Sequence, residues 1–446
     1  MLRTQNKTRN ISLYHMTKRL LLLTLLLCIF QPSMAQKRTD EQLRNLLLKA
    51  GNESVNVLLQ DLEKYRVQII YTEINRDKHN KPSFKNHYFN YDPDLYFNPA
   101  STVKMPLAFM ALEKLNTLQK KGIDKHTPVV FDSSQVGQTP LHADATAANG
   151  LPSIAHFIKR ALLISENDPY NRLYQFVGQQ EVNRSLQRKG YKDSRIVRQF
   201  MGFTTEQNRY SNPVRFLNAD GSTKYAQPAL YNTDSIDFSQ VIKLGKAHYD
   251  SRDTLVQGPF DFTAHNKLPL EDLQQLLQSV MFPKSVPKKQ RFNLTKDDYD
   301  FLYRYLSQYP SETPYPKYDD SIYYDSYVKF FFRNDSHQMP RHVRVFNKVG
   351  WSYGFLTDVS YVADFENQVE YMLSATVYVN SDEVLNDGKY DYDTLGYPFL
   401  YHLGQIIYQH ELKRERKFKP DLSAFQVQYE KRDENDKRPA LSEVDN

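Results

Sequence analysis

The stretch Phe97-Asn-Pro-Ala-Ser-Thr-Val-Lys-Met-Pro-Leu-Ala108 places a serine and a lysine at the start of an apolar helix. A turn closed by proline leads into Ser101, and apolar residues recur at helical spacing as far as residue 118. Two side chains three residues apart on a helix share one face, about 5–6 Å apart at Cβ. A lysine held neutral at that distance can take the proton from a serine hydroxyl. We therefore predict that Ser101 is a nucleophile and that Lys104 is its base.

The spacing alone is not specific for catalysis. It also occurs at Ser285 and Lys288 and at Ser326 and Lys329, to which we assign no role. The structural alternative for Ser101 is a helix N-cap, with an exposed lysine three residues later. What distinguishes Ser101 is the proline turn before it and the apolar helix after it, which together bury the serine.

Two further short elements follow along the chain. Ser165-Glu-Asn167 lies between two expected helices, where a hydroxyl and an amide can both face a cleft. Lys348-Val-Gly350 lies on or at the start of an expected strand, where the glycine lets a substrate approach the backbone. Each pattern is common, and taken alone Ser165 is typical of a helix N-cap and Lys348 of a solvated charge at a strand end.

In this order the three elements resemble those of a known family. Pro99-Ala-Ser-Thr-Val-Lys104, Ser165-Glu-Asn167 and Lys348-Val-Gly350 are similar to the S-x-x-K, S-D-N and K-T-G elements of class A β-lactamases and penicillin-binding proteins. The resemblance spans roughly residues 66–410. It implies a serine hydrolase that cleaves a β-lactam or a related amide, or a D,D-peptidase acting on cell-wall peptides. The expected partner is a small-molecule or cell-wall peptide substrate, and no cofactor is expected.

The resemblance also implies catalytic roles for three residues. Ser101 would attack the amide carbonyl and form an acyl-enzyme, with Lys104 as its base. Ser165 would pass the proton to the leaving nitrogen.

Substrate binding is implied for residues of the second and third elements. Asn167 would hold the substrate amide, and Lys348 would supply charge for a substrate carboxylate beside Gly350. The backbone N–H groups of Ser101 and Trp351 would form the oxyanion hole, where loss of one donor typically costs about 10²–10³ in rate.

The sequence departs from the family pattern at three places. Val349 stands where the family has a threonine or serine hydroxyl, and Glu166 stands in place of the aspartate. The E-x-x-L-N setting of the deacylating glutamate is missing. Glu206 is the nearest acid in the corresponding region and is our candidate deacylation base, with an exposed loop acid as the alternative. The pattern is compatible with a slow lactamase or with a peptidase.

The order of predicted elements indicates an α+β fold. We expect an antiparallel sheet built from N- and C-terminal strands and flanked by helices, with a helical region inserted. The expected strands are 66–74, 83–90, 343–346, 357–363 and 369–379, and the expected helices are 40–49, 102–118, 153–163, 168–177, 235–246, 271–281 and 397–410. The hydrolase domain would cover 36–410, with an insertion at about 282–342 that is either helical or a flap over the substrate. Residues 411–446 are mostly charged and are expected to be disordered.

The N-terminus reads as a secretory signal peptide, residues 1–35. Lys18 and Arg19 precede an apolar stretch, 20–30, which is shorter than the about 20 residues of a membrane span. We expect cleavage before Gln36, export to the periplasm or medium, and no membrane span afterwards. The single cysteine, Cys28, follows Leu27, which is too large for a lipidation site, so no lipid anchor is expected.

The net charge of +6 arises in this N-terminal segment. Residues 1–35 contain five Lys and Arg residues and no Asp or Glu. In the rest of the chain the numbers of basic and acidic residues are nearly equal. We therefore expect no nucleic-acid partner. The 12 histidines show no paired metal-ligand spacing, so no metal site is expected.

Two rival interpretations remain. Gly350-Trp-Ser352-Tyr-Gly354 matches the nucleophile elbow of α/β-hydrolases, with Asp391 or Asp393 and His402 following in the required order. That elbow needs a strand, a tight turn and then a helix. The other rival is an exported binding protein that keeps the scaffold but has lost catalysis.

Overall fold

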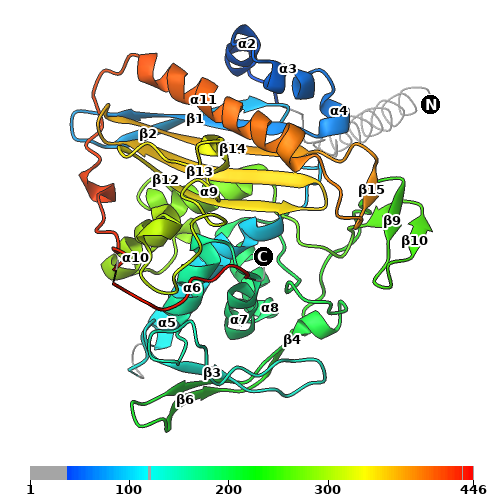
Figure 1. Cartoon of the computed structure of the whole chain (residues 1–446), viewed down its shortest axis with the longest axis vertical. Helices are drawn as coiled ribbons and strands as arrows, with labels where there is room; N and C mark the ends of the chain where they lie inside the picture. The colour runs from blue at the N-terminus through cyan, green and yellow to red at the C-terminus, as the bar shows by residue number, and fades with distance from the viewer. Residues whose placement is uncertain (1–37, 119–121, 434, 445–446) are drawn as a thin grey trace, which may run out of the picture. The chain divides into compact units, whose positions relative to one another are not determined.

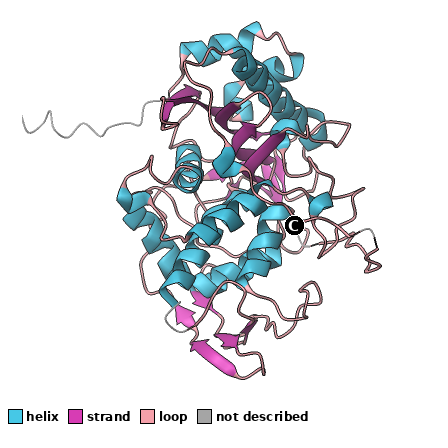
Figure 2. Cartoon of the chain, turned by 90° about the vertical axis from the view of Figure 1, so that its left-hand side faces the viewer, coloured by secondary structure: helices cyan, strands magenta, loops and turns pink. Residues whose placement is uncertain are grey.

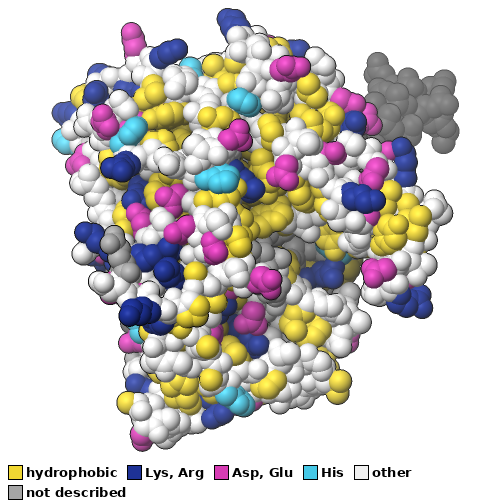
Figure 3. Space-filling model, in the orientation of Figure 1, with side chains coloured by type: hydrophobic (Ala, Val, Ile, Leu, Met, Phe, Trp, Pro, Cys, Tyr) yellow, Lys and Arg dark blue, Asp and Glu magenta, His cyan; other side chains and the backbone are white. Residues whose placement is uncertain are grey.

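The computed structural model describes residues 38–118, 122–433 and 435–444. The predicted signal peptide and Cys28 lie outside these residues. Among the helices of the described ranges, none is both long and apolar enough to cross a membrane. On the face drawn in Figure 3, Lys and Arg side chains alternate with Asp and Glu side chains.

A five-stranded antiparallel sheet lies at the centre of the described fold (Figure 1). Its strand order is β12-β13-β14-β1-β2, so strands from the N-terminal and the C-terminal parts of the sequence form one sheet. The bounds are β1 (Gln68–Arg76), β2 (Pro82–Phe89), β12 (Val343–Ser352), β13 (Phe355–Asp364) and β14 (Val369–Tyr378). The N- and C-terminal strands meet where β1 pairs antiparallel with β14. The predicted α+β class, with a sheet assembled from both parts of the chain, is confirmed.

Both faces of the sheet are covered by helices (Figures 1 and 2). All residues of β13 and β14 are buried, as expected for strands between two apolar layers. One layer holds α2 (Glu41–Lys49), α3 (Glu53–Leu59) and α11 (Tyr397–Lys413), and the other holds α9 (Leu270–Met281). Apolar side chains spaced one turn apart, such as Leu400, Leu403 and Ile407 of α11, face the sheet and are fully buried.

The remaining long helices form the body below the sheet in Figure 1. They are α5 (Lys104–Leu118), α6 (Ile154–Leu163), α7 (Asn167–Val177), α8 (Gln179–Lys189) and α10 (Lys296–Ser307). Helix α5 packs against α6 and α7 and is buried from Lys104 to Leu112. The 3₁₀ turn η1 (Ala100–Val103), which leads into α5, contacts strand β12 at the edge of the sheet. This contact brings the first and third sequence elements together.

The prediction of a helix at 235–246 is wrong. The region is extended, and β8 (Lys243–Leu244) pairs with β11 (Phe260–Asp261). The Ile242 N–H donates to Thr263 Oγ1, and the Phe262 N–H donates to the Ile242 carbonyl. These long-range partners take the backbone groups that a helix would have paired locally.

The aromatic-rich segment 282–342 belongs to the core of the fold and does not form a flap. It contains α10 and the turn η6 (Phe330–Phe332), whose three phenylalanines are buried beside α11. A Cβ atom on Gly404 of α11 would lie 2.3 Å from the Phe331 carbonyl oxygen, so the two backbones touch. Of the two sequence-based alternatives, the helical one describes part of this segment.

The segment after α11 differs from its expected disorder. Its described residues, 414–433 and 435–444, pack on the domain through Leu422 and Phe425, which are buried. Phe425 contacts the rings of Phe282, Phe346 and Tyr361. Some of the charged residues that suggested disorder form ion pairs with the domain, as in the Lys159–Glu430 and Arg432–Asp320 pairs.

Candidate active site

Ser101 lies in the turn η1, whose backbone is fixed by short-range hydrogen bonds. The Ala100 N–H donates to Asn98 Oδ1 at 3.0 Å, and Thr102 Oγ1 donates to the Pro99 carbonyl at 2.6 Å. Ala100 itself has φ 44°, in the left-handed region that alanine rarely adopts. The turn leaves Ser101 only 8% exposed at the start of the η1–α5 helix.

Lys104 is completely buried beside Ser101. Its Nζ lies 2.8 Å from Ser101 Oγ, 3.3 Å from Ser165 Oγ and 2.8 Å from Asn167 Oδ1, and it also donates to the Ser165 carbonyl. One amine thus joins the first element to both polar residues of the second. This excludes the alternative of an exposed surface lysine.

Ser165 connects the second element to the third. It is fully buried, with φ 74°, and its Oγ accepts a hydrogen bond of 2.8 Å from Lys348 Nζ. Lys348 also donates to the Val349 carbonyl at 2.9 Å. Ser101, Lys104, Ser165 and Lys348 therefore form one continuous chain of polar contacts.

The charge on Lys348 is destabilised by its surroundings. Burial, followed by the nearby Lys329, lowers the pKa of Lys348 to about 7, against a partial opposing effect of Asp358. Lys329 is buried as well and donates to the Val345 carbonyl and to Asn347 Oδ1. Asn347 donates in turn to Asp358, a buried carboxyl whose pKa burial raises to about 6.

Strand β12 is an edge strand of the sheet, and Gly350 on this strand lies against the nucleophile turn. A Cβ atom on Gly350 would lie 2.5 Å from the Pro99 carbonyl oxygen and 3.0 Å from the Ser101 nitrogen. The glycine is therefore required by the approach of β12 to the chain's own turn, where the sequence suggested approach of a substrate.

The backbone N–H of Trp351 points toward the free edge of strand β12. Ser352 and Phe355 flank a two-residue turn and form the closing, hydrogen-bonded pair of the β12–β13 hairpin. The next pair, Trp351 and Leu356, is then of the type without mutual hydrogen bonds, so the Trp351 N–H points away from β13. This orientation suits an oxyanion-hole donor.

The hairpin also overturns the nucleophile-elbow interpretation. After Ser352 the chain turns through Tyr353 (φ 53°) and Gly354 (φ 81°) and continues as strand β13, where the elbow needs a helix. His402 lies on α11, in the layer that covers the opposite face of the sheet from α9.

The two altered motif residues point away from the reacting groups. Val349 is fully buried in the apolar layer that α11 covers. Glu166 is 2% exposed, accepts a 2.8 Å hydrogen bond from Tyr318 and forms an ion pair with Arg160. The glutamate therefore anchors the Ser165-Glu-Asn167 turn to the body of the protein.

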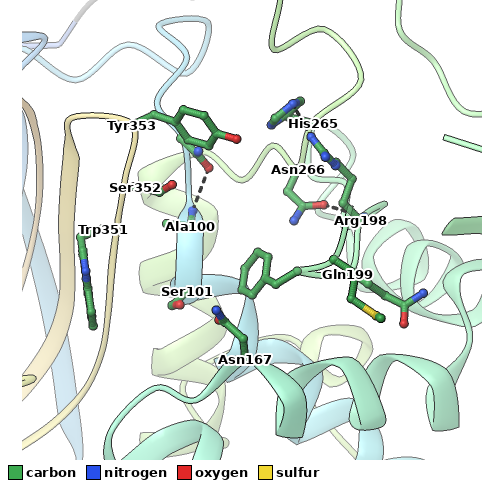
Figure 4. Close-up of a pocket in the computed structure, with 13 residues that line it drawn as sticks. Ala100, Ser101, Asn167, Arg198, Gln199, His265, Asn266, Trp351, Ser352 and Tyr353 are labelled. Carbon is green, nitrogen blue, oxygen red and sulfur yellow. Dashed lines mark hydrogen bonds between the residues drawn. The ribbon is translucent and has the colours of Figure 1, made fainter. Parts of the chain in front are cut away.

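A cavity of about 280 Å³ opens beside Ser101 (Figure 4). Its walls come from the nucleophile turn, Asn167, the β12–β13 hairpin and two loop segments. The lining residues are Asn98, Ala100, Ser101, Asn167, Arg198, Gln199, Phe200, Met201, His265, Asn266, Trp351, Ser352 and Tyr353. This lining contains no Asp or Glu, and it includes none of the described residues of segment 282–342.

The aromatic ring of Phe200 lies close to Lys104. Lys104 Nζ lies 5.1 Å from its ring centroid, and the ring stacks on Tyr170 at 4.4 Å. Asn171 of α7 fixes the Phe200 backbone by accepting from its N–H at 2.8 Å. Phe200 therefore gives the cavity an apolar wall near Lys104.

The structure does not bring Glu206 to this pocket. Its side chain is 60% exposed, accepts a hydrogen bond from Tyr231 at 3.1 Å and lies 3.6 Å from Arg209. The environment matches the exposed loop acid that was the alternative.

The sequence interpretation missed Arg198, Phe200 and His265. They lie in irregular segments with no motif of their own, and a pairing of loop backbones at Arg195 and Lys267 joins the two segments. In this part of the chain the sequence indicated only Glu206. No cluster of His, Cys, Asp or Glu suited to a metal ion occurs within the described ranges.

A family comparison agrees with the geometry. Residues 38–229 match the model of the β-lactamase enzyme family, a range that contains Ser101, Lys104 and the second element, while Lys348 lies beyond it. Over these residues the chain is similar to the β-lactamase enzyme family.

Several solved structures are similar to the chain at low identity. One is the chromosome-encoded β-lactamase of Vibrio parahaemolyticus (12% identity, 80% of this chain and 98% of that chain covered, TM-score 0.43). Another is a class A β-lactamase from Mycobacterium abscessus (13%, 80% and 98%, TM-score 0.42). A third is a mutant of PBP-A in an acyl-enzyme complex with penicillin G (12%, 82% and 96%, TM-score 0.44). A search of curated proteins found no match.

Proposed function

We propose that the protein is an exported serine hydrolase that cleaves amide bonds through an acyl-enzyme on Ser101. The observation that carries this proposal is the 2.8 Å contact between Lys104 Nζ and Ser101 Oγ, with both residues buried and Ser101 in the cavity lining. A neutral amine at that distance can accept the hydroxyl proton as the serine attacks.

The proton then has a short route to the leaving group. Ser165 Oγ lies 3.3 Å from Lys104 Nζ and 2.8 Å from Lys348 Nζ, so its hydroxyl can give a proton to the leaving nitrogen and regain one from an amine. The N–H groups of Ser101 and Trp351 stabilise the oxyanion, and Asn167 binds the substrate amide.

Removal of the acyl group by water is the slow step in this proposal. Hydrolysis of an acyl-enzyme needs a base that activates water, and the cavity lining holds no carboxylate. Beside Lys104 the cavity wall offers the aromatic ring of Phe200, which cannot act as a base. These features favour a penicillin-binding type of enzyme, acting on cell-wall peptides, over a fast β-lactamase.

The first test is the intact mass of the chain from Gln36 onward after incubation with benzylpenicillin. We expect a persistent adduct, one penicillin per chain, which Ser101→Ala abolishes. Ser285→Ala is the matched control, because Ser285 has a lysine at the same spacing but is exposed and lies outside the cavity lining.

Other outcomes of this test have defined meanings. Rapid consumption of the penicillin without an adduct would show that the protein is a β-lactamase and not a peptidase of the penicillin-binding type. An adduct that survives in Ser101→Ala would overturn the assignment of the nucleophile. Neither an adduct nor consumption, with penicillins or cephalosporins, would favour the binding-protein alternative.

A further inference from the structure

The cavity beside Ser101 lies on one side of the reacting groups. Its lining includes Ser101 and Trp351, the proposed nucleophile and oxyanion donor, but not Ser165 or Lys348. In the proposed mechanism Ser165 protonates the leaving nitrogen, so the leaving group departs on the Ser165 side. The cavity is therefore placed to hold the acyl part of the substrate, which stays on Ser101.

Arg198 supplies the cationic side chain of this cavity and is fixed in place. Its backbone N–H donates to Asn266 Oδ1 at 3.0 Å, and its carbonyl accepts from the buried Tyr170 hydroxyl at 2.6 Å. Its guanidinium donates to Nε2 of His265 (Figure 4). The backbone is held at two points and the guanidinium at one, which reduces the conformational entropy that is lost when a ligand binds.

His265 orients Arg198 without adding charge. Burial and the neighbouring Arg198 lower the pKa of His265 to about 3, so the ring is neutral near pH 7 and can accept from the guanidinium. Within the described part of the chain, Arg198 forms no ion pair with a carboxylate. The cavity thus presents one fixed positive charge and no negative one.

We propose that this cavity binds an acyl group that bears a carboxylate, and that Arg198 binds that carboxylate. A guanidinium offers a planar fork of N–H donors that matches a carboxylate, and a charge-assisted pair of this kind is stronger than a neutral hydrogen bond. The inference rests on the proposed function. It goes beyond it by naming the chemistry of the substrate on the acyl side of the cleaved bond.

Two penicillins provide a matched test. Carbenicillin is benzylpenicillin with one added carboxylate on the acyl side chain, and the β-lactam ring is the same. We expect the wild-type protein to be acylated by carbenicillin about ten- to a hundredfold faster than by benzylpenicillin at low concentrations, as measured by intact mass.

Substitution of the arginine should remove this preference. Arg198→Gln is expected to react with both penicillins at similar rates, and Arg198→Lys to restore part of the preference. The control is Arg188→Gln, since Arg188 is exposed and lies outside the cavity.

The outcomes separate this inference from the proposed function. Equal acylation of the wild type by both compounds, with the adduct on Ser101, would overturn the inference and leave the proposed function standing. A preference that survives in Arg198→Gln would overturn the role of Arg198. If neither penicillin acylates Ser101, the proposed function fails and the inference falls with it.

Discussion

Gly350 and Ser101 are in backbone contact: a Cβ atom on Gly350 would lie 3.0 Å from the Ser101 nitrogen. The edge strand of the sheet and the nucleophile turn are therefore packed so closely that only glycine fits between them. This contact sets the position of the Trp351 N–H relative to Ser101, and with it the proposed oxyanion hole.

Gly350→Ala should slow acylation strongly without unfolding the protein. The added methyl group must push the turn away from β12, and displacements near 1 Å at a reacting centre cost about 10²-fold in rate. The rate of adduct formation with benzylpenicillin measures the effect, and the thermal midpoint reports folding. Gly202→Ala is the matched control, because nothing lies within 4 Å of its Cβ position. A Gly350→Ala protein acylated at the wild-type rate would contradict the proposed role of this contact.

Phe200→Glu should speed the loss of the acyl group. It places a carboxylate at the cavity wall beside Lys104, where the wild type has only an aromatic ring, and general-base catalysis is typically worth about 10²–10⁴ in rate. The decay of the penicillin adduct after removal of free drug measures deacylation. Glu206→Gln, by contrast, should leave the decay unchanged, since Glu206 is exposed. If the adduct instead decays much more slowly in Glu206→Gln than in the wild type, Glu206 would again be the candidate deacylation base.

Lys348→Met should weaken the dependence of stability on pH. The folded-state pKa of Lys348 is about 7, below its usual 10.5, so between these values the unfolded chain binds a proton that the folded chain does not. The free energy of unfolding of the wild type therefore rises as the pH increases from about 7 toward 10.5. Urea unfolding at pH 7 and pH 9 should show a smaller rise in Lys348→Met, with the remainder due in part to Lys329. Identical pH slopes in the two proteins would argue against a depressed pKa at Lys348.

Glu166→Ala should destabilise the fold by about 3–5 kcal/mol, the usual effect of removing one partner of a buried ion pair. The change leaves the charge of Arg160, whose side chain is 11% exposed, without its partner at the second element. Equilibrium unfolding in urea gives the magnitude. Glu181→Ala breaks an exposed pair with Arg188 and should cost no more than about 1 kcal/mol. Equal effects of the two substitutions would mean that Glu166 is not an anchor.

Phe425→Ala tests whether the C-terminal segment contributes to the core. Phe425 is 4% exposed among four aromatic rings, and truncation of a buried phenylalanine costs about 3–5 kcal/mol. Phe418→Ala is the control, since Phe418 is 37% exposed and should change stability little. A negligible effect of Phe425→Ala would support the disorder predicted from the charged composition.

The sequence by itself determined which elements form the sheet and which residues form the polar chain at the site. Alternating apolar residues identify strand β1, because side chains on a strand alternate between two faces. The three-residue spacing of Ser101 and Lys104 is likewise a local property of a helix, so their contact follows from the chain alone. The elements Ser165-Glu-Asn167 and Lys348-Val-Gly350 were recognised through their order in the sequence.

Only the tertiary structure decided the rest, because it depends on residues brought together from distant segments. Segment 235–246 is extended since Thr263 and Phe262 satisfy its backbone, and no local propensity encodes such partners. The segment after α11 packs on the domain because Phe425 contacts aromatic rings from distant parts of the chain, Phe282, Phe346 and Tyr361. The cavity wall of Arg198, Phe200 and His265 is also assembled by loop pairing. The absence of Asp and Glu from this cavity lining therefore could not be predicted from the spacing of residues in the sequence.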